Sequence, residues 1–259
     1  MLRCNDYVFA ISPEEAYELN QKRNNVIIGG NGWLKMGKRQ WNTAIDISGL
    51  GLDNIEEDSK EFNIGAMVSL RDIELHKGLN SYTKGAVKES LRNIVGTQFR
   101  NTVTVGGSIY GRFGFSDVLS MFIVMDSYVK LQKGGIVPLH EFAKMPYDND
   151  ILLGITVKKT PLKIAYSSFR NQSTDFPVLT CAVAIGEEKI TTAIGARPSK
   201  ADIRTDSIAV LNDIENYARK TARSFNYESN MRASGEYREH IAEVLIKRTI
   251  EKTEVHYGN

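Results

Sequence analysis

Hydrophobic and polar positions divide the start of the chain into a small α/β unit. The stretch SPEE at 12–15 is a helix start, because the serine caps the first turn, the proline suits the first helical position and the second glutamate completes a capping box. We expect a helix over about residues 13–22. Short apolar runs predict strands at 26–28 and 43–47, with the loop GGNGWL at 29–34 between them.

From about residue 62 the pattern becomes a mixture of strands and helices. FNIGAMVS at 62–69 indicates a strand, and Ser69 caps a short helix after it. Ser81 is expected to open a longer helix that ends at Gly96. The apolar face of this helix comprises Val87, Leu91, Ile94 and Val95. The alternation Thr-Val-Thr-Val at 102–105 predicts a half-buried strand.

The remaining pattern predicts elements on both sides of a polar junction at Pro161. Before the junction we expect a short helix over 117–125, a hairpin that turns at Gly134-Gly135 and a strand over 151–159. After it we expect three strands and a helical tail, at 162–169, 178–185, 189–196 and from Ser234 onward.

Composition describes a folded protein of one or two domains. The 259 residues are 42% hydrophobic and 25% charged, which is ordinary for a globular protein with a large core. The change of pattern near residue 160 favours two domains, 1–160 and 161–259. We expect the first to have a small α/β part, about 1–55, and a larger α+β part, about 56–160.

Charge and hydropathy narrow the range of partners. The formal net charge is only +2, with both signs mixed along the chain, which argues against a nucleic-acid partner. The start of the chain has no uninterrupted apolar signal segment. Apolar runs such as MFIVM at 121–125 are far shorter than the roughly 20 residues that cross a bilayer. We therefore expect a soluble, cytoplasmic protein without membrane contact.

No catalytic or metal-binding constellation stands out in the sequence. Cys4 and Cys181 cannot supply the four thiolates of an iron–sulfur cluster. The histidines lack metal-ligand spacing, so we interpret each as a surface or capping residue; they are His76, His140, His240 and His256. A nucleophile elbow, a Walker motif and an HExxH sequence are absent. We therefore predict no catalytic residue and no metal ligand.

Two glycine loops remain, each directly after a short apolar run. Gly29-Gly30 and Gly106-Gly107 have no Cβ, so backbone N–H groups there can converge on phosphate oxygens. Two such loops could clasp one pyrophosphate from two sides. A glycine pair is also a common turn, and the first loop lacks the G-x-G-x-x-G spacing of a Rossmann fingerprint.

The order of the motifs resembles the FAD-binding subunit of molybdenum hydroxylases, the group of xanthine dehydrogenase, carbon monoxide dehydrogenase and nicotinate dehydrogenase. IIGGNGWL (27–34) resembles the first pyrophosphate loop of this family, NIGAMVSLRDIE (63–74) its following strand and helix, and FRNTVTVGGSIYGRFGFSD (99–117) its second loop. The C-terminal domain of the family is resembled by TDFPVLTCAVAI (174–185), IGARPSKADIR (194–204) and NMRASGEYREHIAEVLIKR (230–248). The resemblance covers nearly the whole chain.

The resemblance implies a fold and a cofactor. The fold is α+β, with a two-part FAD-binding domain of the PCMH type, as in vanillyl-alcohol oxidase. A C-terminal domain of the carbon monoxide dehydrogenase flavoprotein type follows, with a three-stranded antiparallel sheet and a helical bundle. The cofactor is FAD, and its pyrophosphate would lie between the two glycine loops.

The resemblance also implies individual contacts to FAD. Thr104 and Ser108 would supply donors to the pyrophosphate, Asp117 would bond the sugar part, and Tyr110 would lie against the flavin ring. Four aliphatic positions would lie beside adenine or flavin, or would simply pack the core; these are Ile94, Val95, Ile151 and Leu152. The full set of expected contacts is Ile28, Gly29, Gly30, Asn31, Gly32, Trp33, Ile94, Val95, Val103, Thr104, Gly106, Gly107, Ser108, Tyr110, Ser116, Asp117, Ile151 and Leu152.

Two positions depart from the family pattern. The first loop has Asn31-Gly32 where the family usually has Thr-Asp or similar residues. The segment Ser167–Asn171 lacks the lysine that relatives carry ahead of an arginine pair, so contacts from this segment are not carried over.

The implied function is electron transfer. FAD would receive electrons from a two-iron, two-sulfur small subunit and pass them to NAD or another acceptor, while a large subunit with the molybdenum cofactor oxidises the substrate. One alternative is a stand-alone FAD oxidoreductase of the same wider fold, such as a relative of enolpyruvyl reductase or alcohol oxidase. Another is a scaffold that keeps the fold without flavin.

Overall fold

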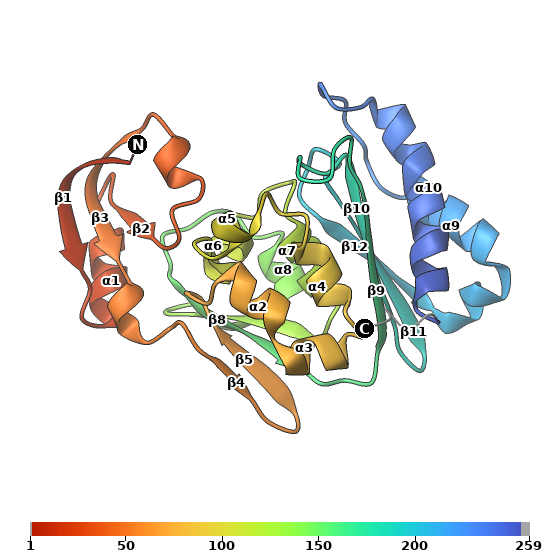
Figure 1. The fold of residues 1–259 in the computed structure, drawn as a ribbon, viewed down its shortest axis with the longest axis horizontal. Coiled ribbons are helices and arrows are strands. Elements are labelled where there is room, and N and C mark those ends of the chain that lie inside the picture. The colour runs from red at the N-terminus through yellow and green to blue at the C-terminus, as the bar shows by residue number, and fades with distance from the viewer. Residues whose placement is uncertain (1, 255–259) are drawn as a thin grey trace.

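The computed structural model describes residues 2–254, which form three parts side by side (Figure 1). The first part is a parallel sheet of order β1-β3-β2 with α1 packed on it. Its elements are β1 (Arg3–Phe9), α1 (Pro13–Asn20), β2 (Val26–Ile28), η1 (Leu34–Met36), β3 (Gln40–Asp46) and η2 (Ser48–Leu50). The predicted helix start is confirmed, because Ser12 Oγ accepts a hydrogen bond from Glu15 N at 3.1 Å. Strand β1 is not foreseen by the pattern because most of its residues are exposed.

The middle part is an antiparallel sheet of order β4-β5-β8-β6-β7, with helices over one face (Figure 1). Its strands are β4 (Ile55–Glu57), β5 (Glu61–Gly65), β6 (Ser127–Leu131), β7 (Gly135–Pro138) and β8 (Leu152–Lys158). Its helices are α2 (Leu70–Leu75), α3 (Lys77–Tyr82), α4 (Ala86–Leu91), α5 (Thr97–Arg100), α6 (Val105–Tyr110), α7 (Asp117–Phe122) and α8 (Leu139–Phe142). The predicted hairpin is confirmed as β6 and β7, and Gly135 takes a φ of 69° at its turn.

The long helix predicted from Ser81 is wrong. Ser81 lies inside α3, and α4 starts only after Lys84 and Gly85, whose φ angles are 48° and 84°. Two consecutive left-handed residues reverse the chain direction, and an apolar period of 3.6 contains no signal for that break. The residues that end the predicted apolar face therefore lie beyond α4, and Val95 is 48% exposed.

The third part is an antiparallel sheet of order β12-β11-β10-β9, so the expected three-stranded sheet has four strands. Its strands are β9 (Lys163–Phe169), β10 (Leu179–Ile185), β11 (Lys189–Gly195) and β12 (Asp202–Ser207). Strand β12 has the sequence DIRTDS and lies at the edge, where backbone pairing to β11 needs no apolar alternation. The pattern therefore missed it.

Helices cover one face of this third sheet (Figure 1). They are η3 (Ile208–Asp213), α9 (Ile214–Arg223) and α10 (Gly235–Lys252), two α-helices rather than the expected bundle. Ser234 caps α10 as predicted, since its Oγ accepts a hydrogen bond from Tyr237 N at 3.2 Å. Helices α4 and α7 of the middle part pack on the other face.

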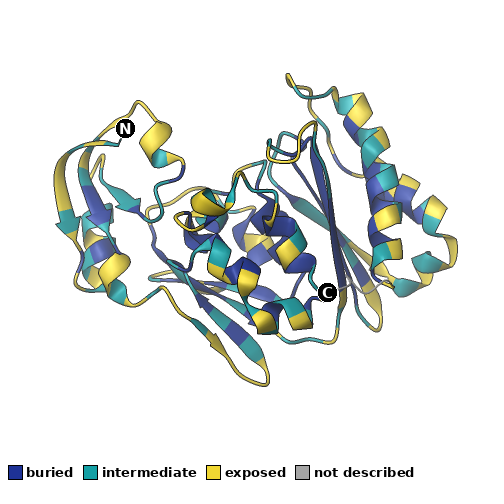
Figure 2. Ribbon diagram, viewed as in Figure 1, coloured by how far each residue is buried: buried dark blue, intermediate teal, exposed yellow. Residues whose placement is uncertain are grey.

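The central strands of the third sheet are consequently buried on both faces, whereas no residue of the edge strand β12 is buried. All seven residues of β10 are buried, and β9 and β10 are dark blue over most of their length in Figure 2. Ala182 and Ala184 belong to the core of the middle part, whereas Cys181 and Val183 face α9 and α10. Among residues 2–254, none of the helices has the length and apolar character that a bilayer crossing requires.

Candidate functional site

A groove of about 1240 Å³ runs along the junction of the three parts. Its walls come from the loop after β2, from α6 and the residues around it, from the segment 147–152 before and into β8, and from the segment 174–177 of the third part. Every predicted cofactor contact lines this groove except Ile28, which is buried inside β2. The structure thus brings together residues from distant stretches of the sequence.

The second glycine pair lies in the first turn of a helix, so the strand predicted over 102–105 is wrong. Thr104 makes one isolated bridge to Ser69 and then caps α6, its Oγ1 accepting a hydrogen bond from Gly107 N at 3.2 Å. Threonine suits both a strand and a helix cap, and the period-2 pattern cannot distinguish them over four residues. Ser108 Oγ donates to the Thr104 carbonyl at 3.0 Å.

The two glycines of this pair have different surroundings. A Cβ on the buried Gly106 would lie 2.5 Å from the Ala66 carbonyl oxygen, so packing alone requires glycine there. A Cβ on the exposed Gly107 would meet only Thr104 Oγ1 within 4 Å, at 3.3 Å. The open side of the pair is therefore the side of Gly107, which lines the groove.

The first glycine loop packs directly against the second. A Cβ on Gly30 would lie 1.9 Å from the Thr102 carbonyl oxygen, so the two backbones touch. Asn31 follows with a φ of 54°, and its Oδ1 is buried without a hydrogen-bond partner among the described residues. Because buried polar atoms are normally bonded, this amide fits a site that a polar ligand completes. The loops therefore form one cradle that suits a phosphate-bearing molecule.

Asp117 lies at the groove but is held by the third part. Its Oδ1 accepts hydrogen bonds from Tyr166 Oη, in β9, and from Arg170 Nη2, in the loop after β9. Burial raises the pKa of the Asp117 carboxyl, while the charge of Arg170 and both hydrogen bonds oppose this rise. Ser116, rather than Asp117, caps α7, its Oγ accepting from Leu119 N at 3.0 Å.

An aromatic cluster closes one side of the groove. Trp33 stacks on Phe176 with centroids 5.3 Å apart, Phe113 stacks on Phe115 at 5.3 Å, and Phe115 contacts Phe176 at 4.5 Å. Only Trp33 was expected there. The phenylalanines at 113 and 115, directly after the second loop, were a signal in the sequence, but nothing local indicates their contact with position 176.

The aliphatic residues expected to contact FAD differ in how far they are buried. Ile151 and Leu152 are almost fully buried, which also satisfies the core-packing alternative. Val95 does not fit that alternative, because it is 48% exposed and has a φ of 51°, which is rare for a β-branched residue. Tyr110 packs near Phe142 with centroids 6.1 Å apart, and its Oη donates to the Asp148 carbonyl at 2.7 Å.

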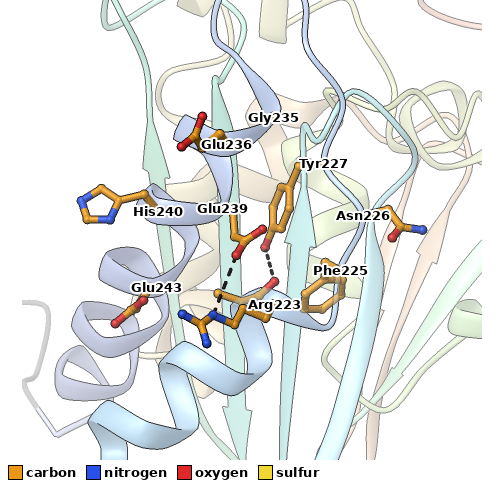
Figure 3. A pocket seen from close by; sticks show the side chains of 10 residues that line it. Arg223, Phe225, Asn226, Tyr227, Gly235, Glu236, Glu239, His240 and Glu243 are labelled. Atoms are coloured by element: carbon orange, nitrogen blue, oxygen red, sulfur yellow. Dashed lines mark hydrogen bonds and ion pairs between the residues drawn. The ribbon is translucent and has the colours of Figure 1, made fainter.

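The third part contains a second, smaller cavity of about 680 Å³ between α9 and α10 (Figure 3). Glu239 points toward Arg223, at 4.0 Å, and His240 and Glu243 also belong to the lining. It has no glycine cradle and no aromatic wall of stacked rings. We therefore place the functional site in the groove.

None of the three histidines within residues 2–254 lines the groove. His76 Nδ1 accepts from Leu79 N at 3.2 Å and so caps α3, as interpreted. His140 and His240 are exposed, and His256 lies outside the described residues. Within residues 2–254, no group of three or more histidine, cysteine or acidic side chains is placed to hold a metal ion.

Residues 3–159, more than half of the chain, match the family described as the FAD binding domain in molybdopterin dehydrogenase. The chain belongs to this family. The resemblance inferred from the motifs is therefore confirmed, and with it FAD as the cofactor and the oxidoreductase class.

Two related proteins match this chain over nearly their full length. The chain is 24% identical over 242 residues to the uncharacterized protein YgfM of Escherichia coli K12, covering 91% of each. It is 23% identical to the nicotine 6-hydroxylase medium subunit of Paenarthrobacter nicotinovorans, covering 94% of this chain and 95% of the relative.

Solved structures show the same fold. A carbon monoxide dehydrogenase from Hydrogenophaga pseudoflava superposes with a TM-score of 0.86 at 19% identity, covering 99% of both chains. Quinoline 2-oxidoreductase from Pseudomonas putida 86 gives 0.80 at 17% identity, covering 96% of both. The likeness in fold to these two structures thus extends over the third part as well.

Proposed function

We propose that this chain is the FAD-containing electron-transfer subunit of a molybdenum hydroxylase. It would receive electrons from a two-iron, two-sulfur small subunit and pass them to NAD or another acceptor, beside a large subunit that holds the molybdenum cofactor. The observation that carries the proposal is the cradle of two touching glycine loops at the groove, next to the unpartnered Asn31 Oδ1. The medium-subunit name of the nicotine hydroxylase relative supports the multisubunit form.

In this proposal the chain's own residues bind and orient the cofactor. The pyrophosphate would lie between Gly29–Trp33 and Gly106-Gly107. The side-chain amide of Asn31 can rotate by about 180°, so that its NH2 group rather than its oxygen would face the phosphate. Asp117, fixed by Arg170, would accept a hydrogen bond from the sugar part. When bound, FAD supplies the conversion between one-electron and two-electron transfer. The aromatic cluster and Ile151 would keep water from one side of the groove.

Purification of the chain alone tests whether it is an electron-transfer subunit rather than a complete enzyme. We expect noncovalent FAD that is released on denaturation, without iron or molybdenum, because two cysteines cannot ligate a cluster. Affinity purification from the native cell should recover two further subunits, one with iron and acid-labile sulfide. A colourless chain would favour the flavin-free scaffold. Substrate turnover by the isolated chain would favour the stand-alone oxidoreductase.

Tyr110→Ala should shift the flavin absorbance and raise the Kd for FAD about fivefold, since an aromatic contact contributes about 1 kcal/mol. The proposed position of its ring against the flavin motivates this prediction. Tyr110→Phe is the matched control, because it keeps the ring and removes only the hydroxyl that bonds Asp148. Flavin fluorescence and absorbance titrations measure both. An Ala variant with the wild-type spectrum and Kd would show that Tyr110 only packs the core.

A further inference from the structure

Arg112 is a buried cation directly behind the groove. Its side chain is 1% exposed, and it follows the second glycine loop and α6 in the sequence. Its φ is 44°, a left-handed conformation that normally favours glycine. A charged residue in an unfavourable backbone conformation and out of water suggests a role that compensates for these costs.

The guanidinium of Arg112 is bound by neutral groups. Nη1 donates to the carbonyls of Phe142, Met145 and Pro146 at 3.1–3.3 Å, and Nε donates to the Tyr110 carbonyl at 3.2 Å. Nη2 is buried without a hydrogen-bond partner among the described residues. Within residues 2–254, no carboxylate forms an ion pair with this charge, so its field extends into the surroundings.

Two aromatic rings separate this charge from the groove. The guanidinium carbon lies 4.4 Å from the Tyr147 ring centroid and 5.4 Å from that of Tyr110, and both residues line the groove. Lys200 Nζ lies over the same Tyr147 ring at 5.0 Å. The nearby Asp148 is exposed to solvent, which screens its charge.

Asp150 is the other acidic residue on this side. It is buried, but its carboxylate accepts hydrogen bonds from three backbone N–H groups, of Lys133, Gly134 and Ile151. Their dipoles offset much of its negative charge. Arg112 and Lys200 thus place two cations against the ring of Tyr147, whereas Asp148 accepts a hydrogen bond from the hydroxyl of Tyr110 at 3.0 Å.

We propose that Arg112 is a positioning residue that raises the two-electron reduction potential of the flavin. The proposal rests on the proposed function, with the flavin ring at Tyr110. Reduction of the ring by two electrons with uptake of one proton leaves one additional negative charge on it. A fixed, buried cation near the ring stabilises that charge more than it stabilises the uncharged oxidised form.

Substitutions separate this electrostatic role from a purely structural one. Arg112 also joins the loop after α6 to the segment after α8, so its loss lowers stability in either case. Arg112→Gln removes the charge and keeps amide donors, whereas Arg112→Lys keeps the charge and loses the planar fork. The potential should follow the charge, and the stability should follow the hydrogen bonds.

Arg238 provides a matched control. It is also fully buried, and its guanidinium donates to the carbonyls of Val178 and Glu228 and to Asn230 Oδ1, without a carboxylate. It does not line the groove. Arg238→Gln should therefore lower stability and leave the flavin potential unchanged.

The experiment is redox titration of the FAD-loaded chain with dithionite and indicator dyes, together with titration by sulfite, which adds to electron-poor flavins. In Arg112→Gln we expect the equilibrium constant of two-electron reduction to fall about tenfold, which is a drop of about 30 mV in the potential. The sulfite affinity should fall as well, because sulfite addition also leaves a negative charge on the ring. Arg112→Lys should stay within about twofold of wild type, since it keeps the charge.

A bound flavin with wild-type potential in Arg112→Gln would overturn the inference and leave the proposed function intact. A wild-type chain that binds no FAD would overturn both. Where Arg112→Gln does not fold, Lys200→Glu places a negative charge over the same Tyr147 ring without touching the buried contacts. It should lower the sulfite affinity, and an unchanged affinity there would count against the proposal.

Discussion

Gly107→Val is expected to abolish FAD binding while the protein stays folded. The added Cβ meets no backbone from outside its own helix, since the one atom found within 4 Å of it is Thr104 Oγ1. Its methyl groups would instead occupy the open side of the cradle, where we place the pyrophosphate. We expect the Kd for FAD to rise at least about 100-fold, a loss of roughly 3 kcal/mol. Flavin content of the purified variant and circular dichroism measure the two parts of this result.

Gly96→Val is the matched control for this substitution. Gly96 has no atom within 4 Å of its Cβ position, an extended backbone with a φ of −150°, and no place in the lining of the groove. The same side chain there should leave FAD binding unchanged. Full flavin occupancy in Gly107→Val would show that the pyrophosphate lies elsewhere.

Gly106→Ala should have the opposite outcome from Gly107→Val. Its Cβ would clash with the Ala66 carbonyl, so the cost falls on folding rather than on the ligand. In this interpretation Gly106 is required for packing against Ala66, whereas Gly107 leaves space for the pyrophosphate.

Arg170→Met should destabilise the protein by about 3–5 kcal/mol, because it leaves the Asp117 carboxylate buried without its cationic partner. Both side chains are at most 6% exposed, so water cannot replace the guanidinium. Urea denaturation measures the loss. The double variant with Asp117→Asn should recover much of it, since no charge then remains to be compensated.

Arg232→Met is the control for that variant. Arg232 pairs with Asp175 at 3.1 Å, but this pair is 25% and 36% exposed. Its loss should cost no more than about 1 kcal/mol. Equal losses in the two variants would show that the Asp117–Arg170 pair contributes no more than a surface pair.

The loss in Arg170→Met should also depend on pH. Without the guanidinium, burial raises the pKa of Asp117 further above its unfolded value of about 3.9. The folded state then binds more protons than the unfolded state, so the free energy of unfolding falls as pH rises above that value. The difference from wild type should therefore be larger at about pH 7 than at about pH 5.

Sequence patterns found the parts of this protein whose structure is local. The capped helices at Ser12 and Ser234 and the hairpin at Gly134-Gly135 follow from neighbouring residues, and each is confirmed. Thr104 shows the limit, since its side chain decides between strand and helix through one hydrogen bond that alternation does not encode.

The site itself could be predicted only in part. The glycine loops were identified from composition and motif order, and they do meet in space. The hold of Arg170 on Asp117 joins residues 53 positions apart, and the contact of Trp33 with Phe176 spans a longer separation still. Periodicity describes one element at a time, so contacts between elements require the fold. The individual FAD contacts and the domain boundary at residue 160 stay predictions.

The packing of the third-part sheet on helices α4 and α7 of the middle part has a consequence for biosynthesis. The core beneath the groove includes Tyr166, Ala182 and Ala193, which leave the ribosome after residues 3–159, the source of most of the groove lining, have been made. Until β9, β10 and β11 arrive, the inner faces of α4 and α7 lack their covering layer. A nascent chain at that stage exposes apolar surface and depends on the last hundred residues to bury it.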